Sequence, residues 1–328
     1  MISIFTRDDI FAVNVSNFPD GETITRYAGN SKPLNILWQY ESDNELMALA
    51  QLYSILRSND LHNRFPKNLY IPYLPHARQD RAATKDTCNA VGTFVSMLNH
   101  IIKNSNTKVF TLDVHSSTCI DIFETYTSPR YHEMTFQYEN IDSAYFASLI
   151  PNPAYDAVIC PDNGALRRTR LWWNEIFARK MTDEQYKEGN IGTRSEWPSN
   201  NPGHKTFINC TKNRDPETGK LSNPSIDNPA HVEYLKTIKR ALLVDDIGTG
   251  FGTHIQLGNV IKTHNPNIKL DLFVSHSSFT RGLAPVLDVF DTVYTTDSLP
   301  QGNNICSNSC LKNRVIRFNC INCVPEII

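Results

Sequence analysis

The chain has 328 residues, of which 40% are hydrophobic, and a formal net charge of −2. This composition is typical of a globular protein with one large or two medium-sized domains. The near-neutral charge, without a basic block, argues against nucleic acid as the main partner. No apolar run approaches membrane-spanning length and the N-terminal residues lack a signal-peptide pattern, so we expect a cytoplasmic protein that binds no membrane.

Short apolar runs alternate with helical patterns along most of the chain. Strands are predicted at 34–38, 68–73, 108–113, 157–160, 241–244, 269–274 and 292–295. Helices are predicted at 43–57, 87–102, 143–149, 166–179 and 254–262. Strands that alternate with helices favour mostly parallel sheets. Because the series restarts after residue 140, we expect an α/β protein with domains at 1–140 and 141–300, followed by a tail at 301–328 that packs back on the body.

Two stretches depart from this order. Residues 180–230 contain a long polar segment, which is typical of a functional lid or a disordered loop. Four of the eight cysteines are grouped near the C-terminus, at Cys306, Cys310, Cys320 and Cys323. Their spacing allows a zinc site, but residues 315–324 also have a strand pattern, which would point Cys320 and Cys323 to opposite faces. Buried or reduced thiols are the favoured alternative.

The segment from Ala241 to Thr253 carries the most informative pattern. Buried-strand residues lead into Asp245 and Asp246, a glycine-rich loop follows, and a helical pattern then begins. Such a loop directs backbone N–H groups and a helix dipole at an anion, and ligands of open α/β sheets bind at strand ends. Adjacent carboxylates can accept hydrogen bonds from vicinal ribose hydroxyls. The segment therefore predicts a ribose-phosphate site, and the alternative is a glycine-rich turn after a buried strand.

Other polar clusters supply phosphate or metal ligands. The run from Arg78 to Arg81 follows a predicted strand, and paired arginines can bind polyphosphate in a bidentate manner. His115 and Asp162 also follow strands, and a carboxylate such as Asp162 suits Mg²⁺. Lys212 and Arg214 alternate in the polar segment and can reach one ligand together. Each cluster alone also fits a solvated loop or a structural histidine, but together they indicate a site for Mg-nucleotide and ribose phosphate.

These motifs, in this order, resemble those of the ribose-phosphate pyrophosphokinases, also called phosphoribosyl diphosphate synthetases. The resemblance implies ATP contacts at Phe18, Asp20, Glu22, Arg78, Gln79 and Asp80, the first three from a neighbouring subunit. It implies catalytic roles for Lys212, Arg214 and His115, and metal contacts at His115 and Asp162. It implies ribose and phosphate binding by Asp245, Asp246, Gly248, Thr249, Gly250, Phe251, Gly252 and Thr253.

The resemblance also implies a fold and a reaction. The fold is two similar Rossmann-like domains of the type I phosphoribosyltransferase kind, assembled as a homodimer or a higher homo-oligomer. The reaction transfers the β,γ-diphosphoryl group of Mg-ATP to the 1-hydroxyl of a ribose 5-phosphoryl acceptor, and AMP leaves. Mg²⁺ is the expected cofactor, and ATP and ribose 5-phosphate are the expected substrates.

The phosphate loop departs from the family pattern, which reads D-T/S-G-G-T. Here it reads Thr249-Gly-Phe-Gly-Thr253, so the loop acid is missing and Phe251 replaces a glycine. This change, and a segment at 182–205 that is longer than usual, leave open a larger 5-phosphodiester acceptor such as ADP-ribose, which would place the protein in NAD-related metabolism. Phe251 can alternatively pack on the outer face of the loop. A phosphoribosyltransferase and a non-catalytic regulatory homologue are the remaining alternatives.

Overall fold

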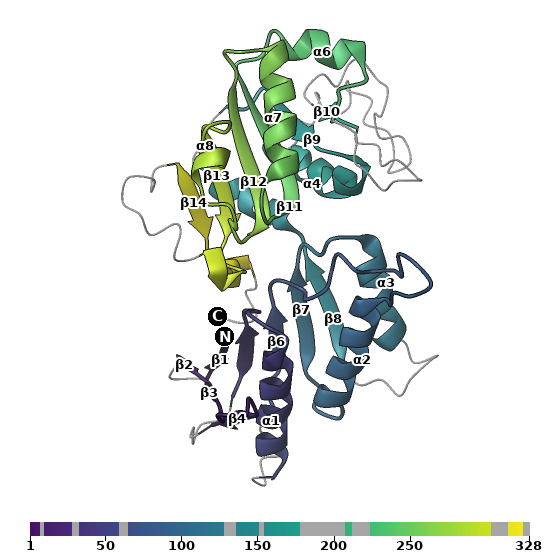
Figure 1. Ribbon diagram of the computed structural model, residues 1–328, viewed down its shortest axis with the longest axis vertical. Coiled ribbons are helices and arrows are strands. Elements are labelled where there is room, and N and C mark those ends of the chain that lie inside the picture. The colour runs from purple at the N-terminus through teal and green to yellow at the C-terminus, as the bar shows by residue number, and fades with distance from the viewer. Residues whose placement is uncertain are drawn as a thin grey trace, which may run out of the picture. The chain divides into compact units, whose positions relative to one another are not determined.

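The computed structural model describes residues 1–6, 10–27, 33–58, 65–127, 136–150, 154–177, 207–211, 224–302 and 314–323. These residues form two compact units, each with one six-stranded sheet (Figure 1). Unit 1 contains the described residues up to Ile141, Ser298–Gln301 and the segment from Asn319. Unit 2 contains the described residues of Asp142–Asp297 and Gly302–Phe318. None of the helices in these ranges combines the length and hydropathy that a bilayer crossing requires.

The main sheet of unit 1 is mixed. Its strands, in spatial order, are β2 (Ile10–Ala12), β1 (Ile2–Phe5), β5 (Asn35–Trp38), β6 (Asn68–Ile71), β7 (Lys108–Leu112) and β8 (Gln137–Ile141). The strands from β5 to β8 are parallel, whereas β1 is antiparallel to both of its neighbours. The helices of this unit are α1 (Asn44–Ser58), α2 (Ala90–Ile102) and α3 (Ser117–Thr127). A separate two-stranded ribbon is formed by β3 (Asn14–Asn17) and β4 (Thr23–Arg26).

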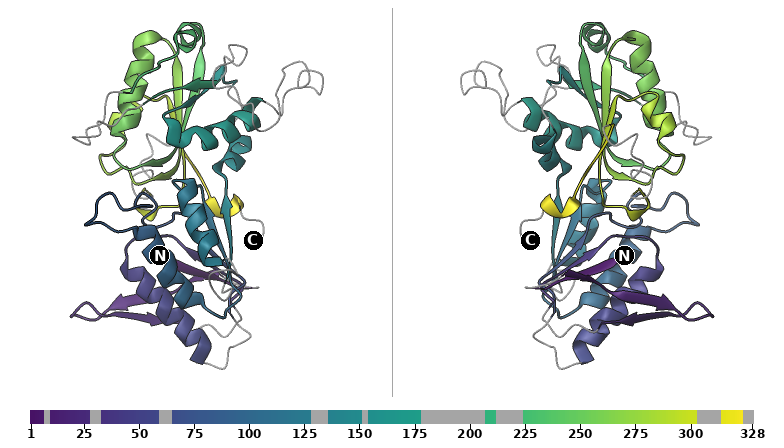
Figure 2. Two further views of the ribbon diagram at one scale, coloured as in Figure 1. Left: turned by 90° about the vertical axis from the view of Figure 1, so that its right-hand side faces the viewer. Right: turned by 90° about the vertical axis from the view of Figure 1, so that its left-hand side faces the viewer.

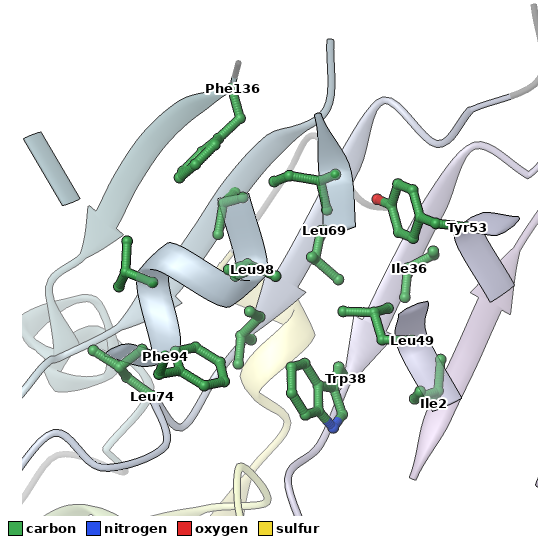
Figure 3. Packing of buried hydrophobic residues seen from close by; sticks show 14 of the residues in the cluster. Ile2, Ile36, Trp38, Leu49, Tyr53, Leu69, Leu74, Phe94, Leu98 and Phe136 are labelled. Atoms are coloured by element: carbon green, nitrogen blue, oxygen red, sulfur yellow. The ribbon is translucent and has the colours of Figure 1, made fainter. Parts of the chain in front are cut away.

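The core of unit 1 lies between the parallel strands and their helices. The apolar stripe of α2 is buried, as the 3.6-residue period predicts, and Phe94 and Leu98 point onto the strands near Leu69 (Figure 3). Leu49 and Tyr53 of α1 pack beside Ile36 in the same layer (Figure 3). Asn89 caps α2, because its side chain accepts a hydrogen bond from the N–H of Gly92 over 2.8 Å. The helix therefore begins three residues later than position 87.

The sheet of unit 2 is entirely parallel. Its strands, in spatial order, are β10 (Phe207–Asn209), β9 (Ala157–Cys160), β11 (Arg240–Gly248), β12 (Lys269–Ser277), β13 (Thr292–Thr296) and β14 (Val315–Phe318). The α-helices are α4 (Leu166–Phe177), α6 (Pro229–Leu235), α7 (Gly252–His264) and α8 (Ala284–Leu287). Helices α7 and α4 cover opposite faces of the sheet (Figure 2). The expected fold class, α/β with mostly parallel sheets, is confirmed.

Short 3₁₀ helices occur at η1 (Ser143–Leu149), η2 (Asn163–Ala165), η4 (Pro300–Gly302) and η6 (Cys320–Cys323). The predicted strand over 315–324 is wrong in its second half, because β14 ends at Phe318 and the chain turns into η6. Cys320 and Cys323 are both buried there, and the hydroxyl of Tyr70 donates to the carbonyl of Cys320 over 2.9 Å. Cys306 and Cys310 lie outside the described residues. No group of three metal-ligating side chains gathers among the residues that the structure describes.

Candidate active site

The loop between β11 and α7 leaves the N-terminus of the helix without a side-chain cap. Thr249 and Gly250 connect the two elements, and Phe251 occupies the cap position with a left-handed backbone at φ 56°. The first N–H groups of a helix have no partner within the helix, so they and the helix dipole attract an anion. The predicted phosphate loop therefore has the backbone arrangement that binds a phosphoryl group.

The ring of Phe251 faces the core of unit 2. Phe251 is 3% exposed, and its ring stacks on that of Phe279 with centroids 4.8 Å apart and planes at 16°. A Cβ added at Gly248 would lie 2.2 Å from the Phe251 ring, so the glycine provides the space that the ring fills. Since the ring does not line the open side of the loop, its presence carries no argument for a larger acceptor.

The acid pair at the end of β11 is held by two basic side chains. Asp245 Oδ2 lies 2.9 Å from Nε2 of His254 in the first turn of α7. Nη1 of the buried Arg168 on α4 lies 3.9 Å from Oδ1 of Asp245 and 3.9 Å from Oδ1 of Asp246. Asp245 Oδ1 also accepts a hydrogen bond from the N–H of Asp246 over 2.9 Å.

Opposing effects act on the pKa of Asp245. Burial raises the pKa of Asp245, and the neighbouring charge of Asp246 adds to the rise. The hydrogen bond from His254 and the charge of Arg168 act against it, but the pKa stays above its ordinary value. Sequence reasoning did not identify Arg168 or His254, because their role depends on which helix residues face the strand end.

Asp162 follows β9, the neighbour of β11 in the sheet. Its Oδ1 accepts hydrogen bonds from the N–H groups of Gly164 at 2.8 Å and Ala165 at 3.3 Å, which fixes the start of η2. Its Oδ2 has no hydrogen-bond partner in the described part of the chain. One carboxylate oxygen, completed by water ligands, is a ligand set that Mg²⁺ accepts, because this ion usually keeps several waters.

Arg281 is a further basic residue at the phosphate loop. The segment that carries it is joined to the loop, since Ser278 N–H donates to the carbonyl of Gly248 over 3.1 Å and Thr280 N–H to that of Thr249 over 2.9 Å. A Cβ added at Gly250 would lie 3.4 Å from Nε of Arg281. The side chain is exposed and has no carboxylate partner among the described residues. A guanidinium placed so can bind a phosphoryl oxygen of a ligand in the loop. The stretch from Ser275 to Gly282 also resembles a family motif, but sequence reasoning assigned Arg281 no role, because its approach to the phosphate loop depends on contacts between two loops.

Lys212 and Arg214 lie outside the described residues. The preceding residue, Thr211, pairs with Ser225 through two backbone hydrogen bonds of 2.9 and 3.0 Å. Asp227 accepts hydrogen bonds from the hydroxyls of Thr211 at 2.5 Å and Ser225 at 2.6 Å. Thr211 and Ser225 are therefore held side by side just beyond the end of β10.

In unit 1, the run from Arg78 to Arg81 follows β6. Arg78, Gln79 and Arg81 are exposed, whereas Asp80 is buried. Asp80 Oδ2 accepts a hydrogen bond of 2.5 Å from the Ser116 hydroxyl, and Oδ1 lies 3.1 Å from Nε of Arg81. Burial raises the pKa of Asp80, but these contacts and the nearby His115 outweigh it and hold the pKa below its ordinary value.

These contacts join two predicted clusters, because Ser116 and His115 follow β7. The half-buried His115 therefore lies near the run at 78–81, where the sequence places a polyphosphate contact. Asp80 itself anchors this run to the segment after β7, while the exposed Arg78 and Gln79 are free of that anchoring contact.

The remaining predicted ATP contacts lie at the tip of the β3–β4 ribbon. Phe18 N–H donates to the carbonyl of Glu22 over 2.8 Å, and Gly21 closes the turn with φ at 94°. Asp20 Oδ1 accepts a hydrogen bond from the N–H of Glu22 over 3.2 Å. Phe18 is 50% exposed, so an aromatic ring is presented at the tip.

The comparisons with known proteins give a fold. No protein-family profile and no curated protein sequence matches the chain. Among solved structures, the chain is similar to the phosphoribosylpyrophosphate synthetase from Mycobacterium smegmatis, with a TM-score of 0.62 and 14% sequence identity. The match covers 94% of this chain and 86% of that one. The two Rossmann-like domains of the phosphoribosyltransferase kind are thereby confirmed, and the chain has the fold of a phosphoribosylpyrophosphate synthetase.

Proposed function

We propose that the chain is a diphosphotransferase that converts ribose 5-phosphate and Mg-ATP into phosphoribosyl diphosphate and AMP. The observation that carries this proposal is the C-terminal part of β11, where Asp245 and Asp246 are followed, after residues 247–251, by an uncapped helix N-terminus. The two carboxylates can accept hydrogen bonds from the ribose hydroxyls. The helix N-terminus and Arg281 can bind the 5-phosphate. The fold relation to a phosphoribosylpyrophosphate synthetase supports the same assignment.

In this reaction the 1-hydroxyl oxygen of the ribose attacks the β-phosphorus of ATP. The bond between the β-phosphorus and the α,β-bridging oxygen breaks, AMP takes that oxygen, and the hydroxyl proton is released. The protein contributes positioning and charge stabilisation, as in other phosphoryl transfers. Residues 249–253 hold the 5-phosphate and Asp246 holds the ribose hydroxyls, so the 1-hydroxyl is oriented.

The nucleotide is assigned to unit 1. Arg78 and Gln79 are exposed donors that bind the phosphates of ATP, while Asp80 keeps their segment in place. Phe18, Asp20 and Glu22 contact the nucleotide of a neighbouring subunit, and this requires a homo-oligomer. His115 contacts the metal-nucleotide complex, and Lys212 and Arg214 bind the diphosphoryl group in transfer. Asp162 would hold Mg²⁺ with water ligands, and the ion supplies neutralisation of the phosphate oxygens.

The experiment measures AMP release from Mg-ATP with ribose 5-phosphate or with ADP-ribose, and identifies the products by mass. AMP with ribose 5-phosphate supports the proposal. AMP with ADP-ribose alone would replace the acceptor by the larger phosphodiester. AMP with neither would overturn the enzyme assignment in favour of a regulatory homologue. Consumption of phosphoribosyl diphosphate and a base without ATP would indicate a phosphoribosyltransferase instead.

A further inference from the structure

His254 is a polar residue on the apolar face of α7. The buried residues of this helix are His254, Leu257, Gly258 and Ile261, which follow the spacing of a stripe that faces the sheet. A buried imidazole without hydrogen bonds costs free energy that an aliphatic side chain at the same place avoids. A histidine at this position therefore requires a polar partner inside the fold.

The contacts of His254 lead to the acid pair. Its Nε2 lies 2.9 Å from Asp245 Oδ2, while its Nδ1 is buried without a partner among the described residues. With the proton on Nε2, the ring donates to the carboxylate and leaves Nδ1 as the bare nitrogen. The ring is also restrained by Phe251, whose centroid lies 5.5 Å away. His254 thus has one strong, directional contact, and that contact is with Asp245.

The same carboxylate continues the chain of contacts to Asp246. Asp245 Oδ1 accepts the N–H of Asp246 over 2.9 Å, so the carboxylate bridges the His254 ring and the peptide group of the next residue. Successive strand residues point to opposite faces of the sheet, and Asp245 shares the α7 face with Leu243. Any rotation of the Asp245 carboxylate therefore disturbs the peptide that carries Asp246.

We propose that His254 is a positioning residue of the acceptor site, which acts through Asp245 to fix Asp246 for the ribose 2- and 3-hydroxyls. This inference rests on the proposed function in that it takes a ribose phosphate as the ligand. It goes beyond it by assigning discrimination between ribose and 2-deoxyribose to a helix residue that does not itself bind the sugar. A site whose polar groups are fixed to bind a hydroxyl discriminates against an analogue without that hydroxyl, because a buried polar group of the protein is then left unpaired.

The experiment measures the affinity of the full-length protein for ribose 5-phosphate and 2-deoxyribose 5-phosphate by calorimetry. His254→Leu removes the donor, His254→Gln keeps a donor at the reach of Nε2, and Gln256→Leu on the exposed face of α7 is the matched control. We expect His254→Leu to weaken ribose 5-phosphate binding about tenfold, which corresponds to about 1.4 kcal/mol. The preference over the deoxy sugar should fall in parallel, while His254→Gln and Gln256→Leu remain close to the parent.

Equal affinity loss in His254→Leu and His254→Gln, or equal loss for both sugars, would show a structural role and overturn the proposal. Unchanged binding by His254→Leu would do the same. If His254→Leu does not fold, His254→Asn takes its place, because its shorter amide does not reach Asp245. Binding needs no turnover, so a parent protein that binds ribose 5-phosphate without releasing AMP contradicts the proposed reaction alone. A parent protein that binds neither sugar contradicts both.

Discussion

Gly248 and Phe251 share one volume at the end of β11, because a Cβ on the glycine would lie 2.2 Å from the phenylalanine ring. Gly248→Ala should therefore displace a ring that stacks on Phe279, and we expect a loss of about 1–3 kcal/mol in the free energy of unfolding. Chemical denaturation measures this loss. Gly252→Ala is the matched control, since nothing lies within 4 Å of a Cβ at that position.

The same pair permits a double-mutant cycle. In a Phe251→Ala background the ring is gone, so Gly248→Ala should cost far less than it does in the parent protein. Phe251→Ala alone should lower the free energy of unfolding by about 3–5 kcal/mol, because the ring is a core residue. Additive effects of the two substitutions would contradict the shared volume.

Arg281 adds a cation to a loop that contains no acid. Arg281→Ala should raise KM for ribose 5-phosphate about tenfold, as the loss of a charged hydrogen bond of roughly 1.5–3 kcal/mol implies after solvent screening. KM for ATP should not change. Steady-state assays with each substrate varied test this, with Lys262→Ala in the last turn of α7 as the control. An unchanged acceptor KM would exclude Arg281 from phosphate binding.

Asp246 is the acid that the proposed site offers to the ribose hydroxyls. Asp246→Asn keeps the shape but removes the charge, so we expect a rise in acceptor KM of about tenfold or more. Thermal unfolding of the same variant serves as the control for folding. Asp246→Asn should also lower the pKa of Asp245, because the charge of Asp246 is one cause of its elevation.

Asp80 links the run at 78–81 to Ser116, and its pKa lies below the ordinary value of 3.8. A depressed carboxyl pKa stabilises the folded protein above the unfolded-state pKa, and this stabilisation is lost as pH falls through the folded-state pKa. Ser116→Ala should therefore lower the free energy of unfolding by about 1.5–3 kcal/mol at pH 7.

The difference in free energy of unfolding between Ser116→Ala and the parent should shrink as the pH falls from about 5 through the depressed folded-state pKa of Asp80, below which both proteins hold a protonated Asp80. Denaturation curves across this pH range test the sign of the pH dependence. The exposed neighbour Ser117, changed to alanine, is the control. A difference that stays constant with pH would mean that the Ser116 hydroxyl acts independently of the Asp80 charge.

Lys212 lies outside the described residues, and its role follows from the family resemblance. Lys212→Ala should lower kcat strongly while leaving the Kd for ATP nearly unchanged, because an interaction made mainly in the transition state affects turnover rather than binding. Parallel measurements of turnover and nucleotide affinity test this. A variant with parental turnover would remove Lys212 from the mechanism.

The regular elements with long apolar signals were predictable from sequence. The strand over 157–160 and the buried stripe of α2 agree with prediction, since burial on both faces and a 3.6-residue period leave clear patterns. The antiparallel strands β1 to β4 were not predicted. In β3 (Asn14–Asn17) and β4 (Thr23–Arg26) polar residues predominate and no apolar run marks a strand. The end of β14 was also missed, since the turn into η6 is fixed by tertiary contacts of its cysteines.

The location of the polar clusters was more predictable than their contacts. His115 and Asp162 lie just beyond the ends of β7 and β9, as expected, but their roles remain predictions. Asp80 follows β6 only after a longer connection, and Asp245 lies within β11, because this strand extends to Gly248 and not only to residue 244. The burial of Phe251 was undetermined because a left-handed backbone at a phenylalanine has no sequence signal. His254 and Arg168 approach Asp245 from two different helices, and only the packed sheet brings these three side chains together.

The hydrogen bond from Tyr70 to Cys320 spans 250 residues of sequence. During synthesis, β6 is made well before Cys320, and the edge strand β14 of unit 2 is made well after β9 and β11. Domains generally fold as they emerge, but unit 1 lacks this hydrogen bond until residues 319–323 have left the ribosome, and unit 2 lacks its edge strand until residues 315–318 have left it. A nascent chain arrested before residue 314 should therefore depend on chaperones, however well its first domain is patterned.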